Sequence, residues 1–171
     1  MGALVKGIAA TLPDLGLLAV LAVLLTMVPG AAVAVPPQES PAEAEAIQRV
    51  VDGFIASLNA ADVNQFIGFF APDATLFFPL SSLPLRLEDR QQIATAFGAF
   101  FEAVWRRHPE PLYMNMIPVG TRVQLLGSVA VVTFHLKGEE AVSRRTLVLE
   151  KRSGRWLIVH LHASSLALET Q

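Results

Sequence analysis

The sequence contains no cysteine. Disulfide bonds, a thiol nucleophile and zinc sites with thiolate ligands are therefore excluded, because each requires a cysteine sulfur. The N-x-S/T acceptor pattern for N-glycosylation is also absent. A domain folded from this chain must be held together by its hydrophobic core alone.

Charged residues are few and balanced in sign. They make up 16% of the chain, and the formal net charge is −2. The basic residues are scattered and form no patch or stripe of the kind that nucleic-acid-binding domains carry. The composition therefore predicts no nucleic-acid partner.

The longest apolar run lies near the N-terminus, at Leu15–Val28. It follows Lys6, is broken by Pro29-Gly30, and precedes the small-x-small tripeptide Ala32–Ala34. This is the anatomy of a secretory signal, and the run is short for a membrane span of about 20 residues. We expect a signal peptide over 1–34, export to the periplasm or the medium, and no stable membrane span after cleavage. The alternative is an uncleaved anchor.

The remaining chain predicts a short lead-in at 35–41 and one domain at 42–168, with three helices first. Ser40 and Pro41 are typical of a helix start, and Glu43 is placed to complete a capping box with Ser40. The helix that follows has apolar residues at helical spacing. Asp62 can cap a short second helix, and the acidic pair Glu88-Asp89 suits the start of a third, which ends before Pro109.

The strands are expected mainly in the second half of the chain. A brief strand is predicted between the second and third helices, and a meander of alternating strands and turns follows Leu112. Helices first and a meander afterwards indicate an α+β fold. The expected strands are 74–78, 113–117, 121–126, 129–137, 143–151 and 154–165.

The last strand carries two histidines in the stretch GRWLIVHLHASS. Strict alternation predicts two faces, neither of them strongly polar: Trp156, Ile158, His160, His162 and Ser164 on one, and Leu157, Val159, Leu161 and Ala163 on the other. One face must pack on the helices, and a second copy is the simplest cover for the other. We therefore expect a homodimer through the sheet.

The element order and this last strand resemble the nuclear transport factor 2-like superfamily. Within it, the chain is similar to SnoaL-like domains and to the association domain of calcium/calmodulin-dependent protein kinase II. The resemblance implies a cone-shaped curved antiparallel sheet packed against three helices, with Trp and His facing a pocket and the opposite face mediating dimers. The residues that carry it are Gly154, Arg155, Trp156, Val159, His160, His162 and Ser164.

The chain departs from the catalytic relative that it resembles around FAPDATLFFP. Where ketosteroid isomerase has its general base, this chain has Phe78, and its first helix lacks the oxyanion-hole Tyr. That mechanism is therefore excluded. The pocket Arg of the kinase association domain corresponds to Leu147 here, although Arg145 shares its face and could reach the same space.

The role of His160 and His162 stays open among four readings. They could be hydrogen-bonded interior groups, contacts for a ligand, general acid/base residues, or the start of a metal site with His135. No carboxylate lies near the pair in sequence, so no metal or cofactor is predicted. As ligand-binding residues we predict His160, His162, Trp156, Tyr113 and Arg145, with apolar walls from Phe77, Phe97, Phe101, Met114 and Met116.

The function expected from the sequence is an exported small-molecule-binding or oligomerisation module with no identified chemistry. Its ligand would be small and either hydrophobic or anionic. The alternative is a SnoaL-like isomerase, cyclase or hydrolase in which His160 or His162 acts as general acid/base on a hydrophobic substrate. No catalytic residue can be assigned from the sequence alone.

Overall fold

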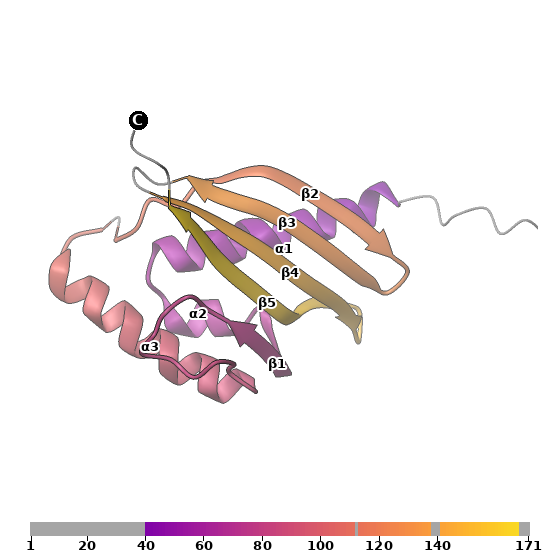
Figure 1. The fold of residues 1–171 in the computed structure, drawn as a ribbon. Coiled ribbons are helices and arrows are strands. Elements are labelled where there is room, and N and C mark those ends of the chain that lie inside the picture. Colours follow the sequence, from indigo (N-terminus) through magenta and orange to yellow (C-terminus); the bar gives the residue numbers. More distant parts are fainter. Residues whose placement is uncertain (1–39, 112, 138–140, 168–171) are drawn as a thin grey trace, which may run out of the picture. The chain divides into compact units, whose positions relative to one another are not determined.

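The computed structural model describes residues 40–111, 113–137 and 141–167. The predicted signal peptide 1–34 and most of the predicted lead-in lie outside these residues. The described part is α+β, as predicted (Figure 1). Its elements are α1 (Pro41–Asn59), α2 (Val63–Ile67), β1 (Phe70–Phe77), α3 (Arg90–Arg107), β2 (Pro118–Leu126), β3 (Val129–Lys137), β4 (Ala141–Arg152) and β5 (Arg155–Ala167).

The helices begin where the sequence predicts, but one cap differs. Asp62 and Asp89 cap α2 and α3 by accepting the backbone N–H groups of Gln65 and Gln92. The predicted capping box of α1 is wrong, because Ser40 makes no side-chain cap hydrogen bond. The carboxylate of Glu43 instead binds side chains of the sheet.

The five strands form one curved, open sheet in the order β1-β5-β4-β3-β2. Strands β2 to β5 make the predicted antiparallel meander, and β1 adds to its edge parallel to β5. The strand predicted at 113–117 is wrong, since its described residues have no strand pairing. The side chain of Asn59 takes the place of a partner strand there.

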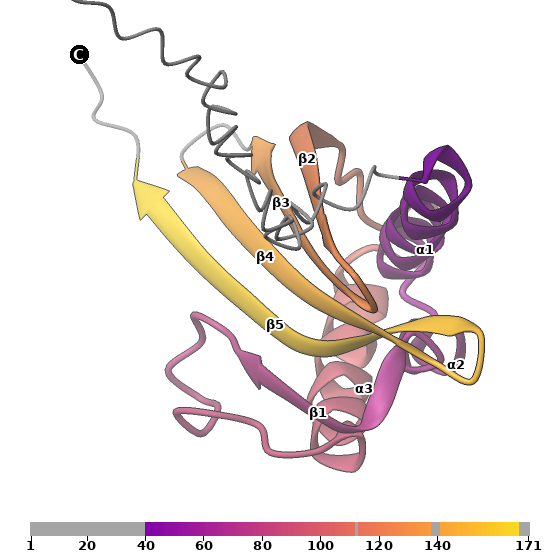
Figure 2. The ribbon, with the colours of Figure 1, turned by 90° about the vertical axis from the view of Figure 1, so that its right-hand side faces the viewer.

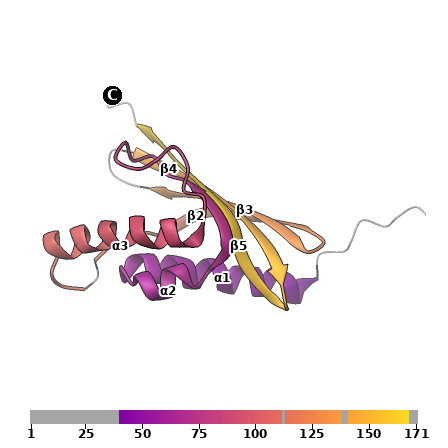
Figure 3. The same cartoon turned by 90° about the horizontal axis from the view of Figure 1, so that it is seen from below.

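The helices cover one face of the sheet, here called the inner face (Figures 2 and 3). A cluster of phenylalanine rings joins the three helices to β1, with Phe66 stacked on Phe97 at 4.4 Å between ring centroids. Burying one such side chain contributes about 1.5–3 kcal/mol. The cluster consists of Phe54, Phe66, Phe70, Phe97 and Phe101.

The opposite, outer face of the sheet is covered by none of the described helices (Figure 3). Residues directly opposite each other on paired strands share a face, so the strand register assigns the outer face. It carries Thr75 and Phe77 of β1, Arg122 of β2, Val131, Thr133 and His135 of β3, Arg144, Thr146, Val148 and Glu150 of β4, and His160, His162 and Ser164 of β5.

Candidate functional site

A β-bulge in β5 separates Trp156 from the two histidines. Leu149 pairs with Ile158, but the preceding Val148 pairs with His160, so Val159 is an extra residue without a partner on β4. Trp156 is 6% exposed and faces the helices, whereas beyond the bulge it is Leu161 that is buried. The prediction that the histidines share the face of Trp156 is therefore wrong, because one extra residue reverses the alternation.

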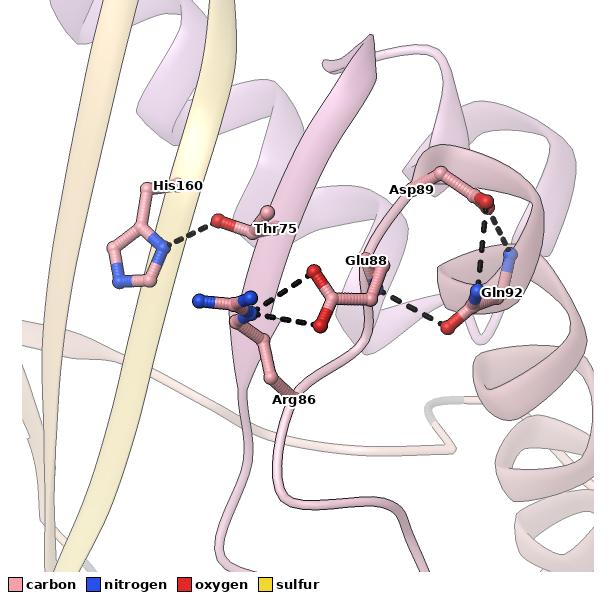
Figure 4. A network of polar contacts seen from close by, with 6 residues as sticks. All are labelled: Thr75, Arg86, Glu88, Asp89, Gln92 and His160. Atoms are coloured by element: carbon pink, nitrogen blue, oxygen red, sulfur yellow. Dashed lines mark hydrogen bonds and ion pairs between the residues drawn. The ribbon is translucent and has the colours of Figure 1, made fainter.

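His160 is held on the outer face by β1. Its Nδ1 and the Thr75 hydroxyl lie 2.8 Å apart (Figure 4). The Phe77 ring lies edge-on to the imidazole, with 5.3 Å between the ring centroids. Arg86 extends toward this pair from the loop before α3 and is itself paired with Glu88 at 3.0 Å. Burial, then the neighbouring His162 and Arg86, lower the pKa of His160. The imidazole is therefore neutral at pH 7.

His162 lies two residues further along the same face and is exposed. It lines a shallow depression of about 320 Å³ together with Arg144, Thr146 and Ser164. The ring of Phe77, its neighbour on β1, lies edge-on to it with 5.8 Å between the ring centroids. The two histidines are thus side by side, but they are on the outer surface and not in an inner pocket.

Trp156 serves as an attachment between the sheet and the first helix. Its indole N–H donates to a carboxylate oxygen of Glu43 at 2.8 Å, and the other oxygen of Glu43 accepts from Lys151. These hydrogen bonds, first from Lys151 and then from Trp156, lower the pKa of Glu43. Trp156 also lines a groove with Arg49 and Arg155. This groove is far from Arg145, which lies on β4 opposite Ala163, whereas Trp156 lies opposite Lys151.

Arg145 is the buried charge of the inner face. Only 8% of it is exposed, and its Nη1 donates to the Arg144 carbonyl at 3.0 Å. The guanidinium carbon lies 5.7 Å from the centre of the Phe78 ring. Among the described residues no carboxylate forms an ion pair with it. Burial lowers the pKa of Arg145 to about 10, so the group still carries its charge at neutral pH.

Arg145 lines a cavity of about 370 Å³ at the open end of the sheet. Of the six other lining residues three are apolar and three are polar, so the cavity offers a small molecule both apolar contacts and hydrogen-bonding groups. Met114 and Met116, predicted as pocket walls, are both part of it, whereas Tyr113 is not and packs near Trp105. The other lining residues are Asn115, Leu136, Lys137 and Ser143.

Asn59, at the end of α1, positions the methionines of this cavity. Its side-chain amide donates to the Met116 carbonyl at 3.0 Å, and its side-chain oxygen accepts the Met116 N–H at 2.8 Å. The Asn59 carbonyl also accepts the Met114 N–H at 3.2 Å. No local sequence pattern marks this role of Asn59, because a side-chain amide that pairs with a distant backbone segment leaves no periodic signal.

A second cavity, of about 470 Å³, lies between α3 and the loop before it. Its wall is apolar apart from two hydroxyl residues and includes Phe97, one of the predicted wall residues. Phe78 lies between the two cavities, since it lines this one and contacts the guanidinium of Arg145. Two other predicted wall residues are elsewhere: Phe77 faces outward, and Phe101 is fully buried. The lining is Phe78, Leu80, Ser82, Leu83, Thr95, Ala96, Phe97, Ala99, Phe100 and Ala103.

The five predicted ligand-binding residues therefore lie in four places. Arg145 lines the inner cavity, His160 and His162 lie on the outer face, Trp156 attaches β5 to α1, and Tyr113 packs near Trp105. In the parts of the chain that the structure describes, no group of three or more His, Asp or Glu is arranged to hold a metal ion. Over the same residues, no helix is both long and apolar enough to cross a membrane.

The curved sheet with helices on one face and a cavity at its open end defines a domain of the nuclear transport factor 2-like kind. A profile of the calcium/calmodulin dependent protein kinase II association domain matches residues 43–167. The chain belongs to that family. A search of the curated proteins finds no match.

Solved structures with the same fold come from several bacteria. A nuclear transport factor 2-like protein of unknown function from Pseudomonas putida is 15% identical, with a TM-score of 0.61, covering 73% of this chain and 87% of the other. A structure from Xanthomonas campestris, named for the kinase association domain, is 26% identical, with a TM-score of 0.57 and coverage of 75% and 93%. One from Parabacteroides distasonis, named as a ketosteroid isomerase, is 20% identical, with a TM-score of 0.53 and coverage of 68% and 85%.

Proposed function

We propose that this protein is a small-molecule-binding association module, in which the inner cavity holds a small anion at Arg145. The observation that carries the proposal is a buried guanidinium with no carboxylate partner among the described residues. An unpaired buried charge is unfavourable by several kcal/mol. An anionic ligand in the adjoining cavity would remove that penalty and would accept the free N–H groups of Arg145.

The shape and lining of the cavity limit the class of ligand. A planar guanidinium matches a carboxylate through two parallel hydrogen bonds. Met114, Met116 and Leu136 offer apolar contacts for the rest of the ligand, and the cavity volume of about 370 Å³ suits a molecule of few atoms. A short carboxylate with an apolar body therefore fits best.

The acid/base alternative has less support from the geometry. Neither His160 nor His162 is among the residues that line the inner cavity. A general base must come within hydrogen-bond reach of the proton that it removes. A substrate bound at Arg145 would be separated from both imidazoles by the sheet itself.

We further propose that two copies associate through the outer face, and that the protein is exported after cleavage behind Ala34. The family's name as an association domain supports the first proposal, and so do the uncharged Val131, Val148 and Phe77 on the outer face. A wild type that is monomeric at micromolar concentration in sedimentation equilibrium would overturn it. The signal-like pattern of residues 1–34 supports the second. N-terminal sequencing of the protein recovered from its host tests the export proposal, and a chain that still begins at Met1 would overturn it.

The ligand proposal is tested by calorimetry with butyrate and hexanoate, using butylamine and butanol as matched controls. We expect the carboxylates to bind the wild type, and the amine and the alcohol not to bind. The Arg145→Met variant should lose carboxylate binding, because Met keeps an apolar chain of similar length without the charge. Arg122→Met, which removes an exposed Arg of the outer face, should bind like the wild type. Equal binding of carboxylates to wild type and Arg145→Met would overturn the proposal.

A further inference from the structure

The inner cavity and the second cavity meet at one side chain, Phe78. The inner cavity at Arg145 measures about 370 Å³, and the second, between α3 and the loop before it, about 470 Å³. The two are lined by different residues. Phe78 lines the second cavity, and the centre of its ring is 5.7 Å from the guanidinium carbon of Arg145. This ring therefore separates a charged cavity from a largely apolar one.

The end of β1 sets the position of the Phe78 ring. Phe77 is the last residue of β1 and faces outward, so alternation turns the next side chain toward the helices. The Phe78 ring packs edge to face on Phe97 of α3, with 5.3 Å between the ring centroids. Its backbone carbonyl accepts the N–H of Leu80 at 2.9 Å. The side chain is only partly buried, so it is a wall between two open spaces rather than part of the closed core.

The second cavity has the lining that an alkyl chain requires. Eight of its ten lining residues are apolar, and the other two, Ser82 and Thr95, carry hydroxyl groups. A carboxylate bound at Arg145 can reach this space only past Phe78. With the ring in place, a tail longer than the inner cavity extends into water instead, and a CH₂ group that stays in water gains nothing from burial.

We propose that Phe78 is the specificity-determining residue of this site, and that it restricts the ligand to short-chain carboxylates by closing the way from Arg145 into the second cavity. The inference rests on the proposed function and adds to it the residue that sets the chain length. Removal of the ring joins the two cavities. The site then takes a medium-chain carboxylate, with its head group at Arg145 and its tail along α3.

The restriction is tested by calorimetry with butyrate, hexanoate, octanoate and decanoate. In the wild type the affinity should level off beyond hexanoate, with the Kd of decanoate within about threefold of that of hexanoate. In Phe78→Ala, decanoate should bind about tenfold or more tighter than hexanoate, because each CH₂ group that becomes fully buried raises the affinity roughly fourfold. The Kd of butyrate should agree within about threefold between the two proteins.

Three further variants locate the two ends of the ligand. Ala96→Leu adds a larger side chain to the wall of the second cavity, so in the Phe78→Ala background it should remove the gain for decanoate and leave butyrate binding as it is. Arg145→Met in the same background should weaken decanoate binding by about tenfold or more, because the head group loses its partner. Phe100→Ala is the matched control. It removes a ring from the second cavity but leaves Phe78 in place, so it should keep the chain-length profile of the wild type.

Thermal unfolding checks that each variant is folded. If Phe78→Ala does not fold, Phe78→Leu takes its place, with a smaller opening and an expected gain of about threefold or more for octanoate over hexanoate. A wild type that does not bind butyrate would overturn the proposed function and this inference with it. Butyrate binding with the same chain-length profile in the wild type and the Phe78 variants would overturn only the inference. A gain for decanoate that survives Ala96→Leu would place the tail outside the second cavity and would also contradict it.

Discussion

The indole of Trp156 and the carboxylate of Glu43 lie 2.8 Å apart, joining the start of β5 to the first turn of α1. Lys151, opposite Trp156 on β4, donates to the same carboxylate. The three side chains therefore connect two sheet strands to a helix far away in sequence. A connection of this kind fixes where the helix crosses the sheet.

Removing the indole N–H should loosen this connection. Trp156→Phe keeps most of the buried ring but leaves one oxygen of Glu43 without its donor, so we expect the melting temperature to fall by a few degrees. Glu43→Gln keeps an acceptor and should cost less than Glu43→Ala. Differential scanning calorimetry measures all three, and equal melting temperatures for Trp156→Phe and the wild type would contradict the role given to the indole.

Acid should weaken the same region. The pKa values of Glu43 and Asp73 are lowered in the folded protein, chiefly by hydrogen bonds from Lys151 and Arg152. A lowered carboxyl pKa contributes stability that is present above the unfolded value, near 4, and is lost as the pH falls through the folded value. We expect urea midpoints to be steady above about pH 5 and to fall below about pH 4. The fall should be smaller in Glu43→Gln with Asp73→Asn; if it is unchanged, other carboxyl groups control acid unfolding.

The two hydrogen bonds between the Asn59 side chain and the Met116 backbone offer a test of how the inner cavity is built. Asn59→Ala removes two part-buried hydrogen bonds to Met116, and we expect a loss of about 1–3 kcal/mol in the free energy of unfolding. Asn59→Asp can still accept the Met116 N–H but cannot donate to the carbonyl, so its effect should be intermediate. Urea unfolding gives the free energies, and hydrogen exchange should show the Met116 amide opening faster in both variants. If that amide exchanges as slowly in Asn59→Ala as in the wild type, the Asn59 side chain does not hold the Met116 backbone in place.

The pKa of His160, which reports on the surroundings of its ring, can be measured by NMR titration. Its pKa should lie below the ordinary value of about 6.5, because burial, His162 and Arg86 all disfavour the charged ring. Since a depressed histidine pKa favours the neutral ring, this group contributes stability above the unfolded pKa, and that stability declines as the pH falls below it. Arg86→Gln should raise the pKa of His160 by removing a neighbouring positive charge. A pKa at or above 6.5 in the wild type would contradict the described surroundings.

The sequence predicted the three helices, the antiparallel meander and the family, because apolar spacing and capping residues are local signals. It misplaced His160 and His162 because a single unpaired residue, Val159, reverses the strand alternation, and neither its type nor its neighbours mark a bulge. The strand expected at 113–117 failed for a related reason. Its backbone is satisfied by one side chain, Asn59, that is distant in sequence.

The predicted ligand-binding residues also divide into positions that local signals could place and contacts that depend on residues distant in sequence. Arg145 was identified from its position two residues before Leu147, and strand alternation alone is enough to place it on the inner face. That no described carboxylate pairs with it depends on tertiary contacts and could not be read from sequence. Trp156 was expected beside the histidines, but its contact with Glu43 depends on where α1 crosses the sheet, which no local pattern encodes.

The account depends most on Arg145 being an unpaired buried charge that an anion completes. The direct measurement is the free energy of unfolding of wild type and Arg145→Met, each with and without a short carboxylate such as butyrate. Without carboxylate, the free energy of unfolding of Arg145→Met should exceed that of the wild type by about 1 kcal/mol or more, because the variant no longer buries an unpaired charge. Carboxylate should stabilise the wild type alone. A variant that is clearly less stable, together with a wild type that does not respond to carboxylate, would contradict the account.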